Sequence, residues 1–211
     1  SPDQVSDWWD DGLRVVGPTH YGVSAYCHGT GTEGGLTDLG APLLRAMDEV
    51  GMILDLTHMS EGSFWESLEV FQGPVLASHN NCRALVPGDR QFSDDQLRAM
   101  FQRDGVIGAA LDAWMLRPGW VKGETTPEGL TLEAVADQID HVCQLAGNAS
   151  HAAIGSDLDG GYGTEQTPSD LDTIADLQRV LDILRARGYA EADLQAIAHG
   201  NWLRLFEKAW C

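Results

Sequence analysis

Short, continuous runs of apolar residues alternate along this chain with longer segments of helical periodicity. The alternation is typical of βα units wrapped around a parallel sheet, whose strands are buried on both faces. The apolar runs predict five parallel strands, at residues 14–19, 52–58, 74–79, 106–111 and 152–157.

The segments between these runs predict amphipathic helices. One apolar stripe runs from Leu132 to Val142 and another from Leu171 to Leu184, so we expect both helices to pack on the sheet. Ser93 begins a third helix with capping-box spacing. Four glycines are placed to end helices: Gly51, Gly105, Gly147 and Gly188.

Polar residues that can carry chemistry follow four of the five predicted strands. These strands end in or run into Thr19-His20, Thr57-His58, Ser78-His79 and Ser156-Asp157. In barrels of parallel strands, catalytic groups gather at the carboxyl ends of the strands. This repeated placement favours part of an eight-stranded barrel over a small open sheet.

His58 and His79 are candidate metal ligands. Neutral imidazole is a good ligand for zinc, and two histidines at the ends of adjacent parallel strands converge above the sheet. Asp157 follows the last strand, where a carboxylate can accept a proton from water and return it to a leaving amine. Asp159, two residues later, is expected to shape the turn instead.

Composition excludes some classes of partner. The 211 residues carry a formal net charge of −19, which would repel nucleic-acid phosphates and anionic membrane surfaces.

The four cysteines are widely and irregularly spaced, so they indicate neither a zinc ribbon nor a dense disulfide framework, and a reducing compartment such as the cytoplasm is favoured. No apolar run has the length of a membrane span. Ser1 is not an initiator methionine, so a preceding signal peptide is not assessable.

Several short motifs together resemble the membrane (renal-type) dipeptidase family of metallopeptidases. They span nearly the whole chain, and their order and spacing carry the resemblance. The motifs are Gly35-Leu36-Thr37-Asp38-Leu39-Gly40, Leu54-Asp55-Leu56-Thr57-His58-Met59-Ser60, Ser78-His79-Asn80-Asn81, Arg90, Gly155-Ser156-Asp157-Leu158-Asp159-Gly160 and Asn201-Trp202-Leu203-Arg204-Leu205-Phe206.

The resemblance implies a (β/α)8 TIM barrel of the metal-dependent hydrolase (amidohydrolase) type with two zinc ions, and we expect a homodimer. It implies that His58 and His79 bind one zinc, and that His20 contacts the substrate. Arg90 would hold the carboxylate of a dipeptide and Asp157 would act as general acid and base. The implied reaction is hydrolysis of a dipeptide by a metal-bound hydroxide, with a D-residue tolerated on the C-terminal side.

The family's remaining zinc ligands have no counterpart in this sequence. They are a His-x-Asp pair on the first barrel strand and a bridging Glu on the third, whereas residues 1–211 match a single catalytic domain from about strand 4 to strand 8. We therefore expect a missing N-terminal segment or a companion chain to complete the barrel. By itself the chain should hold at most one zinc and be inactive.

Two other functions stay open at this point. One is a metal-poor pseudoenzyme or binding module that keeps the pocket without the reaction. The other is a different amidohydrolase that acts on an amide or a lactone. The zinc content of the protein distinguishes a pseudoenzyme or binding module from a dipeptidase. The range of substrates that it hydrolyses distinguishes another amidohydrolase from a dipeptidase.

Overall fold

A computed structural model describes the whole chain, residues 1–211, and contains the predicted parallel sheet. All neighbouring strands pair in parallel, in the order β1-β2-β3-β4-β5. The strands are β1 (Val15–Val16), β2 (Ile53–Asp55), β3 (Val75–Ala77), β4 (Val106–Ala109) and β5 (Ala152–Ile154). The five predicted strands and their parallel direction are thus confirmed.

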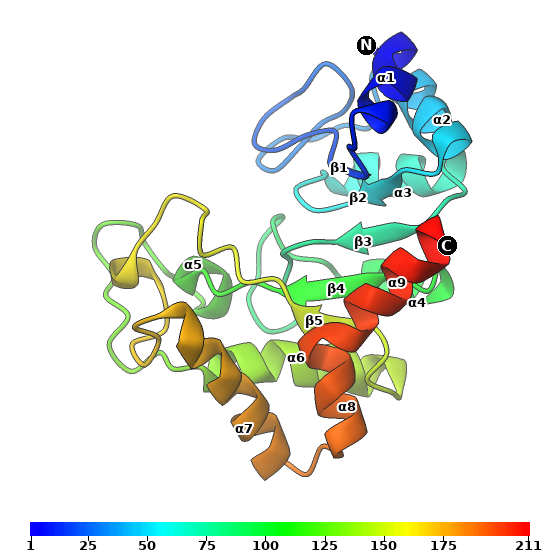
Figure 1. Cartoon of the computed structure of the whole chain (residues 1–211). Coiled ribbons are helices and arrows are strands. Elements are labelled where there is room, and N and C mark those ends of the chain that lie inside the picture. The colour runs from blue at the N-terminus through cyan, green and yellow to red at the C-terminus, as the bar shows by residue number, and fades with distance from the viewer.

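The strands are shorter than the apolar runs suggested. His58, His79 and Asp157 therefore lie in the segments that follow β2, β3 and β5, and not within the strands as predicted. Long loops gather at the end of the sheet toward which the strands run, on the left of Figure 1. Two of these residues leave the extended conformation altogether: His58 has φ 67° and Asp157 has φ 58°.

Helices connect the strands and cover the sheet. They are α1 (Val5–Asp10), α2 (Gly40–Val50), α3 (Glu61–Val70), α4 (Asp94–Gln102), α5 (Ala113–Leu116), α6 (Glu133–Ala146), α7 (Gln178–Ala186), α8 (Glu191–Gln195) and α9 (Asn201–Trp210). Short 3-10 segments span Pro2–Gln4, Thr164–Gln166 and Ile174–Leu177, and a π-helical turn spans Ala196–Gly200.

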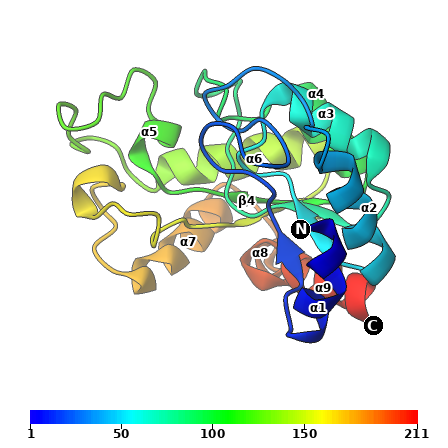
Figure 2. The same ribbon diagram turned by 90° about the horizontal axis from the view of Figure 1, so that it is seen from above.

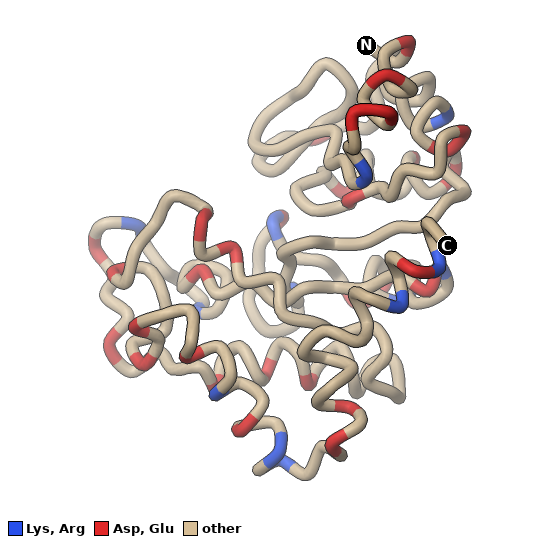
Figure 3. The backbone as a smooth tube through the Cα atoms, in the orientation of Figure 1, with Lys and Arg blue, Asp and Glu red and all other residues tan.

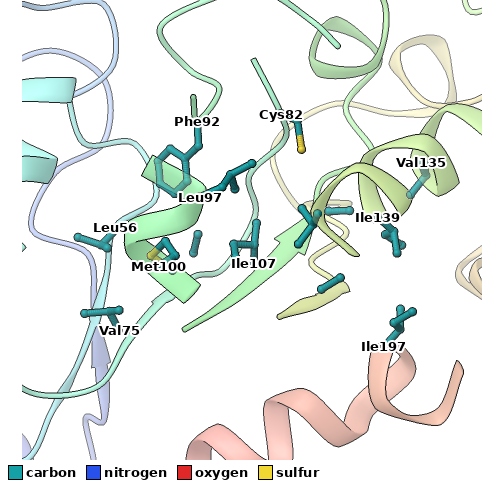
Figure 4. Packing of buried hydrophobic residues seen from close by; sticks show 14 of the residues in the cluster. Leu56, Val75, Cys82, Phe92, Leu97, Met100, Ile107, Val135, Ile139 and Ile197 are labelled. Atoms are coloured by element: carbon teal, nitrogen blue, oxygen red, sulfur yellow. The ribbon is translucent and has the colours of Figure 1, made fainter. Parts of the chain in front are cut away.

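Each face of the sheet has its own apolar layer. Leu54, Val75 and Ile107 belong to the main core with the helices α2, α3, α4 and α6, and Figure 4 shows side chains of α4 and α6 facing this side of the strands. Alternate residues, such as Ile53 and Leu76, form a smaller cluster with α9 on the other face. Seen from above in Figure 2, the sheet lies between these two layers of helices.

Helix ends follow the predicted caps with one exception. Ser93 and Gln96 form a reciprocal capping box at the start of α4, and Gly51 and Gly147 end α2 and α6 in the left-handed conformation. At the end of α4 the left-handed residue is Asp104, with φ 55°, and not the predicted Gly105. Aspartate tolerates this conformation better than most residues, and here its carboxylate also binds α9 through Arg204 and Lys208.

The predicted helix at residues 171–184 is wrong in its extent and its packing. Regular helix begins only at Gln178, and α7 packs on α6 and α8 instead of the sheet. The residues that it buries are Val180 and Leu184, whereas Ile174 is 74% exposed. The stripe was misleading because Ile174 lies in the 3-10 turn that precedes α7, which is capped by Thr173.

Candidate active site

His58 and His79 meet above the ends of β2 and β3. Their Nε2 atoms lie 3.1 Å apart. His58 is buried and His79 is half-buried. Two nitrogen ligands of one tetrahedral zinc ion, each about 2.0–2.1 Å from the metal, would be about 3.3 Å apart, so the spacing fits a shared metal ion.

The other nitrogen of each ring is already occupied. Thr30 Oγ1 lies 3.1 Å from His58 Nδ1 and 3.2 Å from the carbonyl oxygen of His58. Ser78 Oγ lies 2.8 Å from His79 Nδ1 and 3.4 Å from Thr57 Oγ1. With hydrogen on Nδ1, each ring would donate to its hydroxyl partner and present a lone pair at Nε2, which is the tautomer that binds a metal.

Both histidines are held in the neutral form. Burial lowers the pKa of His58 to about 2 and that of His79 to about 4, and the nearby charge of Arg90 adds to both shifts. His79 Nε2 lies 3.9 Å from Asp157 Oδ1, but a neutral imidazole forms no ion pair at pH 7. The pair is thus ready to accept a cation.

The donor set limits how many metal ions this chain can hold. No group of three or more His, Cys, Asp or Glu side chains is arranged to bind a metal ion. The two imidazoles are the ligands that the sequence suggests for one zinc of a two-zinc centre, and this role stays a prediction. The ligands expected for the rest of that centre have no counterpart among these residues.

Arg90 lies in a buried position with neutral partners. Its side chain, 3% exposed, donates from Nη1 to Asn80 Oδ1 at 2.6 Å and from Nη2 to the carbonyl of His79 at 2.8 Å. Neither acceptor is a carboxylate. Burial lowers the pKa of Arg90, and the charges of Tyr21, Asp157, Asp55 and Asp112 oppose this shift. A buried guanidinium of this kind is suited to bind the carboxylate of a ligand.

Asp157 combines an unusual backbone with a shifted pKa. Burial raises the pKa of its carboxyl to about 6, the charge of Arg90 opposes this, and the charges of Asp112 and Asp159 add to it. A pKa near neutrality suits a group that takes up and returns a proton. The left-handed backbone of both Asp157 and His58 is the kind of strain that is found at functional sites.

His20 completes the group that the sequence predicted. Its exposed ring lies 4.0 Å, between centroids, from the ring of His58 and 4.8 Å from that of Tyr21. The structure therefore brings His20, His58 and His79 into a row across the ends of β1, β2 and β3, with Arg90 and Asp157 beside them.

Sequence reasoning missed the residues that hold this row in place. Thr30 fixes the ring of His58, and Asn80 fixes Arg90. Asp55 Oδ1 accepts from the backbone nitrogens of Thr57 and Ser78, which ties the ends of β2 and β3 together. Asp55 and Asn80 lie within the strand-end motifs, so the sequence could have indicated their roles. Thr30 lies 28 residues before its partner His58, and no local pattern marks it.

Comparison with known proteins identifies the family. A model of the membrane dipeptidase family, peptidase family M19, matches residues 1–210. The chain belongs to this family. A Klebsiella pneumoniae protein, described as an uncharacterized protein in the pqqA 5′ region, is 32% identical over 94% of this chain and 73% of its own length. An uncharacterized dipeptidase of Schizosaccharomyces pombe is 26% identical over 98% of this chain and 49% of its own length.

Solved M19 structures share the fold. A crystal structure of a dipeptidase of family M19 matches 99% of this chain and 61% of its own, at 27% identity and a TM-score of 0.87. A Rhodobacter sphaeroides metallopeptidase, solved with a phosphinate mimic of L-Ala-D-Ala, matches 99% of this chain and 59% of its own, also at 27% identity and a TM-score of 0.87. The chain thus spans about 60% of the length of these M19 proteins, and its five-stranded sheet corresponds to part of their barrel.

None of the helices combines the length and the apolar character that a bilayer crossing requires. Acidic residues are distributed over the whole chain, as Figure 3 shows.

Proposed function

We propose that this chain forms the catalytic face of a zinc-dependent dipeptidase that hydrolyses the single peptide bond of a dipeptide. The observation that carries the proposal is the position of the Nε2 atoms of His58 and His79, 3.1 Å apart above the ends of neighbouring strands. Zinc is the ion that this pair fits best, because it favours imidazole nitrogen and a tetrahedral arrangement. A bound zinc ion would supply Lewis-acid polarisation of the scissile carbonyl and a lowered pKa for water.

Arg90 binds the C-terminal carboxylate of the dipeptide. Its buried guanidinium keeps a positive charge that neutral partners do not neutralise, and a carboxylate is the complementary ligand. Because Arg90 donates to the carbonyl of His79, the carboxylate site is fixed relative to the metal ligand.

Asp157 moves the proton during the reaction. Its carboxyl, with a pKa near 6 and Oδ1 at 3.9 Å from His79 Nε2, takes a proton from the attacking water and delivers it to the departing amine. His20 donates a hydrogen bond to the carbonyl oxygen as negative charge develops on it, since its exposed ring stands next to His58.

The family comparison supports a tolerance for a D-residue on the C-terminal side. The Rhodobacter sphaeroides relative was solved with a mimic of L-Ala-D-Ala. We include that dipeptide, beside L-Ala-L-Ala, among the substrates of this protein.

A test compares dipeptides with their C-terminal amides. In this and the following activity tests the zinc-loaded protein is the chain with its barrel completed, since residues 1–211 alone are expected to be inactive. It should hydrolyse Ala-Ala much faster than Ala-alaninamide, which lacks the carboxylate. Arg90→Lys should raise KM for Ala-Ala by about 10-fold or more and leave the slow hydrolysis of the amide unchanged, because a point charge replaces a bidentate fork. Arg98→Lys, an exposed arginine of α4, is the matched control.

Two results would contradict the proposal. One is a zinc-loaded protein that hydrolyses no dipeptide. The other is an Arg90→Lys variant with unaltered KM for Ala-Ala.

A further inference from the structure

Asp112 is a buried carboxylate at the mouth of the site that the proposed reaction does not use. It follows β4 directly and is 5% exposed. Leu111, the preceding residue, donates from its backbone nitrogen to the carbonyl of Ser156 at 3.1 Å. Asp112 therefore emerges next to Asp157, from the neighbouring strand end.

The same strand end is tied to the residues that hold Arg90. Asn81 donates to the carbonyl of Ala110 and accepts from its backbone nitrogen, at 3.1 and 2.9 Å, and the adjacent Asn80 binds Arg90. Because β4 lies between β3 and β5 in the sheet, Asp112, which follows β4, stands between Arg90, above β3, and Asp157, after β5.

Only one oxygen of the Asp112 carboxylate has partners. Oδ1 accepts from the backbone nitrogen of Trp114 at 3.1 Å and from Gln166 Nε2 at 2.8 Å. Oδ2 accepts no hydrogen bond, and it is not among the enclosed polar atoms that lack a partner, so it reaches solvent. The two bonds to Oδ1 fix the carboxylate, and Oδ2 stays free for a ligand.

No cation of this chain lies within ion-pair distance of Asp112. Lys122, exposed in the loop after α5, and the buried Arg90 interact with it through their charges alone. Burial raises the pKa of Asp112, while its hydrogen bonds to Gln166 and Trp114 lower it. The charge of Asp112 also acts on Tyr162. The pKa of that phenol is raised mostly by burial, next by the charge of Asp157, and then by the charge of Asp112. A fixed, mostly buried carboxylate without a cation attracts one from a ligand.

From this geometry we propose that Asp112 selects dipeptides whose C-terminal residue has a cationic side chain, such as lysine or arginine. The inference rests on the proposed function, in which Arg90 holds the C-terminal carboxylate. The side chain of the residue held at Arg90 lies on the β4 side of the site, where it meets Asp112. A cationic side chain pairs with Oδ2, whereas an acidic one is repelled.

The experiment compares three dipeptides that differ only in the C-terminal side chain: Ala-Lys, Ala-norleucine and Ala-Glu. Norleucine has the length of lysine without the charge. For the zinc-loaded protein, kcat/KM for Ala-Lys should exceed that for Ala-norleucine by about 10-fold or more, the range of a charge-assisted pair. Ala-Glu should be the poorest of the three.

Asp112→Asn keeps an acceptor for Trp114 and Gln166 and removes the charge. It should bring the Ala-Lys to Ala-norleucine ratio close to 1, mainly by raising KM for Ala-Lys, and leave Ala-norleucine nearly unchanged. Asp159→Asn removes an exposed charge two residues after Asp157 and is the control that should keep the preference. Melting temperatures of both variants report on folding.

The outcomes separate this inference from the function on which it rests. Hydrolysis of Ala-norleucine without any preference for Ala-Lys overturns the role of Asp112 and leaves the dipeptidase intact. An Asp112→Asn variant that loses activity equally on all three dipeptides also overturns it, because Asp112 would then be structural or bind a group common to all. Absence of hydrolysis of every dipeptide contradicts the proposed function itself.

Discussion

The Nε2 atoms of His58 and His79 lie 3.1 Å apart, and each Nδ1 has a hydroxyl partner, Thr30 Oγ1 for His58 and Ser78 Oγ for His79. The fold brings the two rings together because Asp55 ties the ends of β2 and β3. A metal ion bound to both Nε2 atoms would replace the contact between the rings, and it would find this pair of ligands already in place.

Thr30 should set the metal affinity of His58. In Thr30→Val, Nδ1–H loses its acceptor, so the tautomer with the hydrogen on Nε2 becomes populated and competes with zinc. We expect zinc affinity to fall by about 10- to 100-fold, as for other partners of metal-binding histidines. Competition with a chromogenic chelator measures the dissociation constant.

A neighbouring threonine supplies the control for Thr30. Thr32 lies in the same loop, and its hydroxyl binds the carbonyl of Gly29 at 2.8 Å without touching a histidine. Thr32→Val should keep the affinity of the unmodified protein. Equal affinities for Thr30→Val and Thr32→Val would show that the tautomer of His58 is not set by Thr30.

Gly155 permits the close approach of β5 to the end of β3. A Cβ at this position would lie 1.9 Å from the carbonyl oxygen of Ser78 and 2.8 Å from Gly108 Cα, and both are backbone atoms. Gly155→Ala should therefore destabilise the protein by about 2 kcal/mol or more, and it should displace Asp157, two residues later.

Gly17→Ala is the matched control for Gly155→Ala. Its Cβ would make ordinary contacts of 3.6 Å with the Asp55 carbonyl, so its unfolding free energy should change by less than about 1 kcal/mol. Urea denaturation of the two variants measures the difference. Similar stabilities would argue against a tight packing of β5 on β3.

Asp157 should make the metal-free protein less stable as the pH rises. Its pKa is raised in the folded state from 3.8 to about 6, chiefly by burial, so the folded state favours the protonated carboxyl. The resulting cost is absent below about pH 4, grows between pH 4 and 6, and is complete above about pH 6, at about 1–3 kcal/mol.

Asp157→Asn removes this cost and suits the left-handed backbone at φ 58° as well as aspartate does. In the presence of a chelator, the variant should melt at a higher temperature than the unmodified protein at pH 7.5 and at the same temperature near pH 4. In a separate assay without chelator, the zinc-loaded variant should no longer hydrolyse dipeptides. A melting difference that stays constant over this pH range would contradict the shifted pKa.

The sequence predicted the sheet well because a buried parallel strand needs an unbroken apolar run, and such runs are local. It also predicted His58 and His79, since strand order alone brings the ends of β2 and β3 together. It did not predict Thr30, whose contact with His58 depends on the path of a long loop. Nor did it predict the packing of α7, because the stripe from Leu171 to Leu184 does not show which residues leave the regular helix.

The C-terminal helix is a further feature that periodicity does not place. Residues such as Leu205 predict an amphipathic helix, but not that α9 covers the face of the sheet opposite the main core. The position of α9 depends on individual hydrogen bonds. Among them are those of Asn201, the first residue of α9, which follows the π-helical turn.

Asn201 should be the most sensitive of these contacts. Its buried amide donates to the carbonyls of Ala149 and Ala152, at 2.7 and 2.8 Å, and so fastens α9 to the start of β5. Asn201→Ala leaves both buried carbonyls without this donor and should cost about 1–3 kcal/mol of unfolding free energy.

The control Asn148→Ala removes an exposed amide that bonds only to neighbouring residues and should cost less than about 1 kcal/mol. Because β5 carries Asp157 beyond its other end, hydrogen exchange in β5 should also rise in Asn201→Ala, and unchanged exchange would show that α9 does not hold this strand in place.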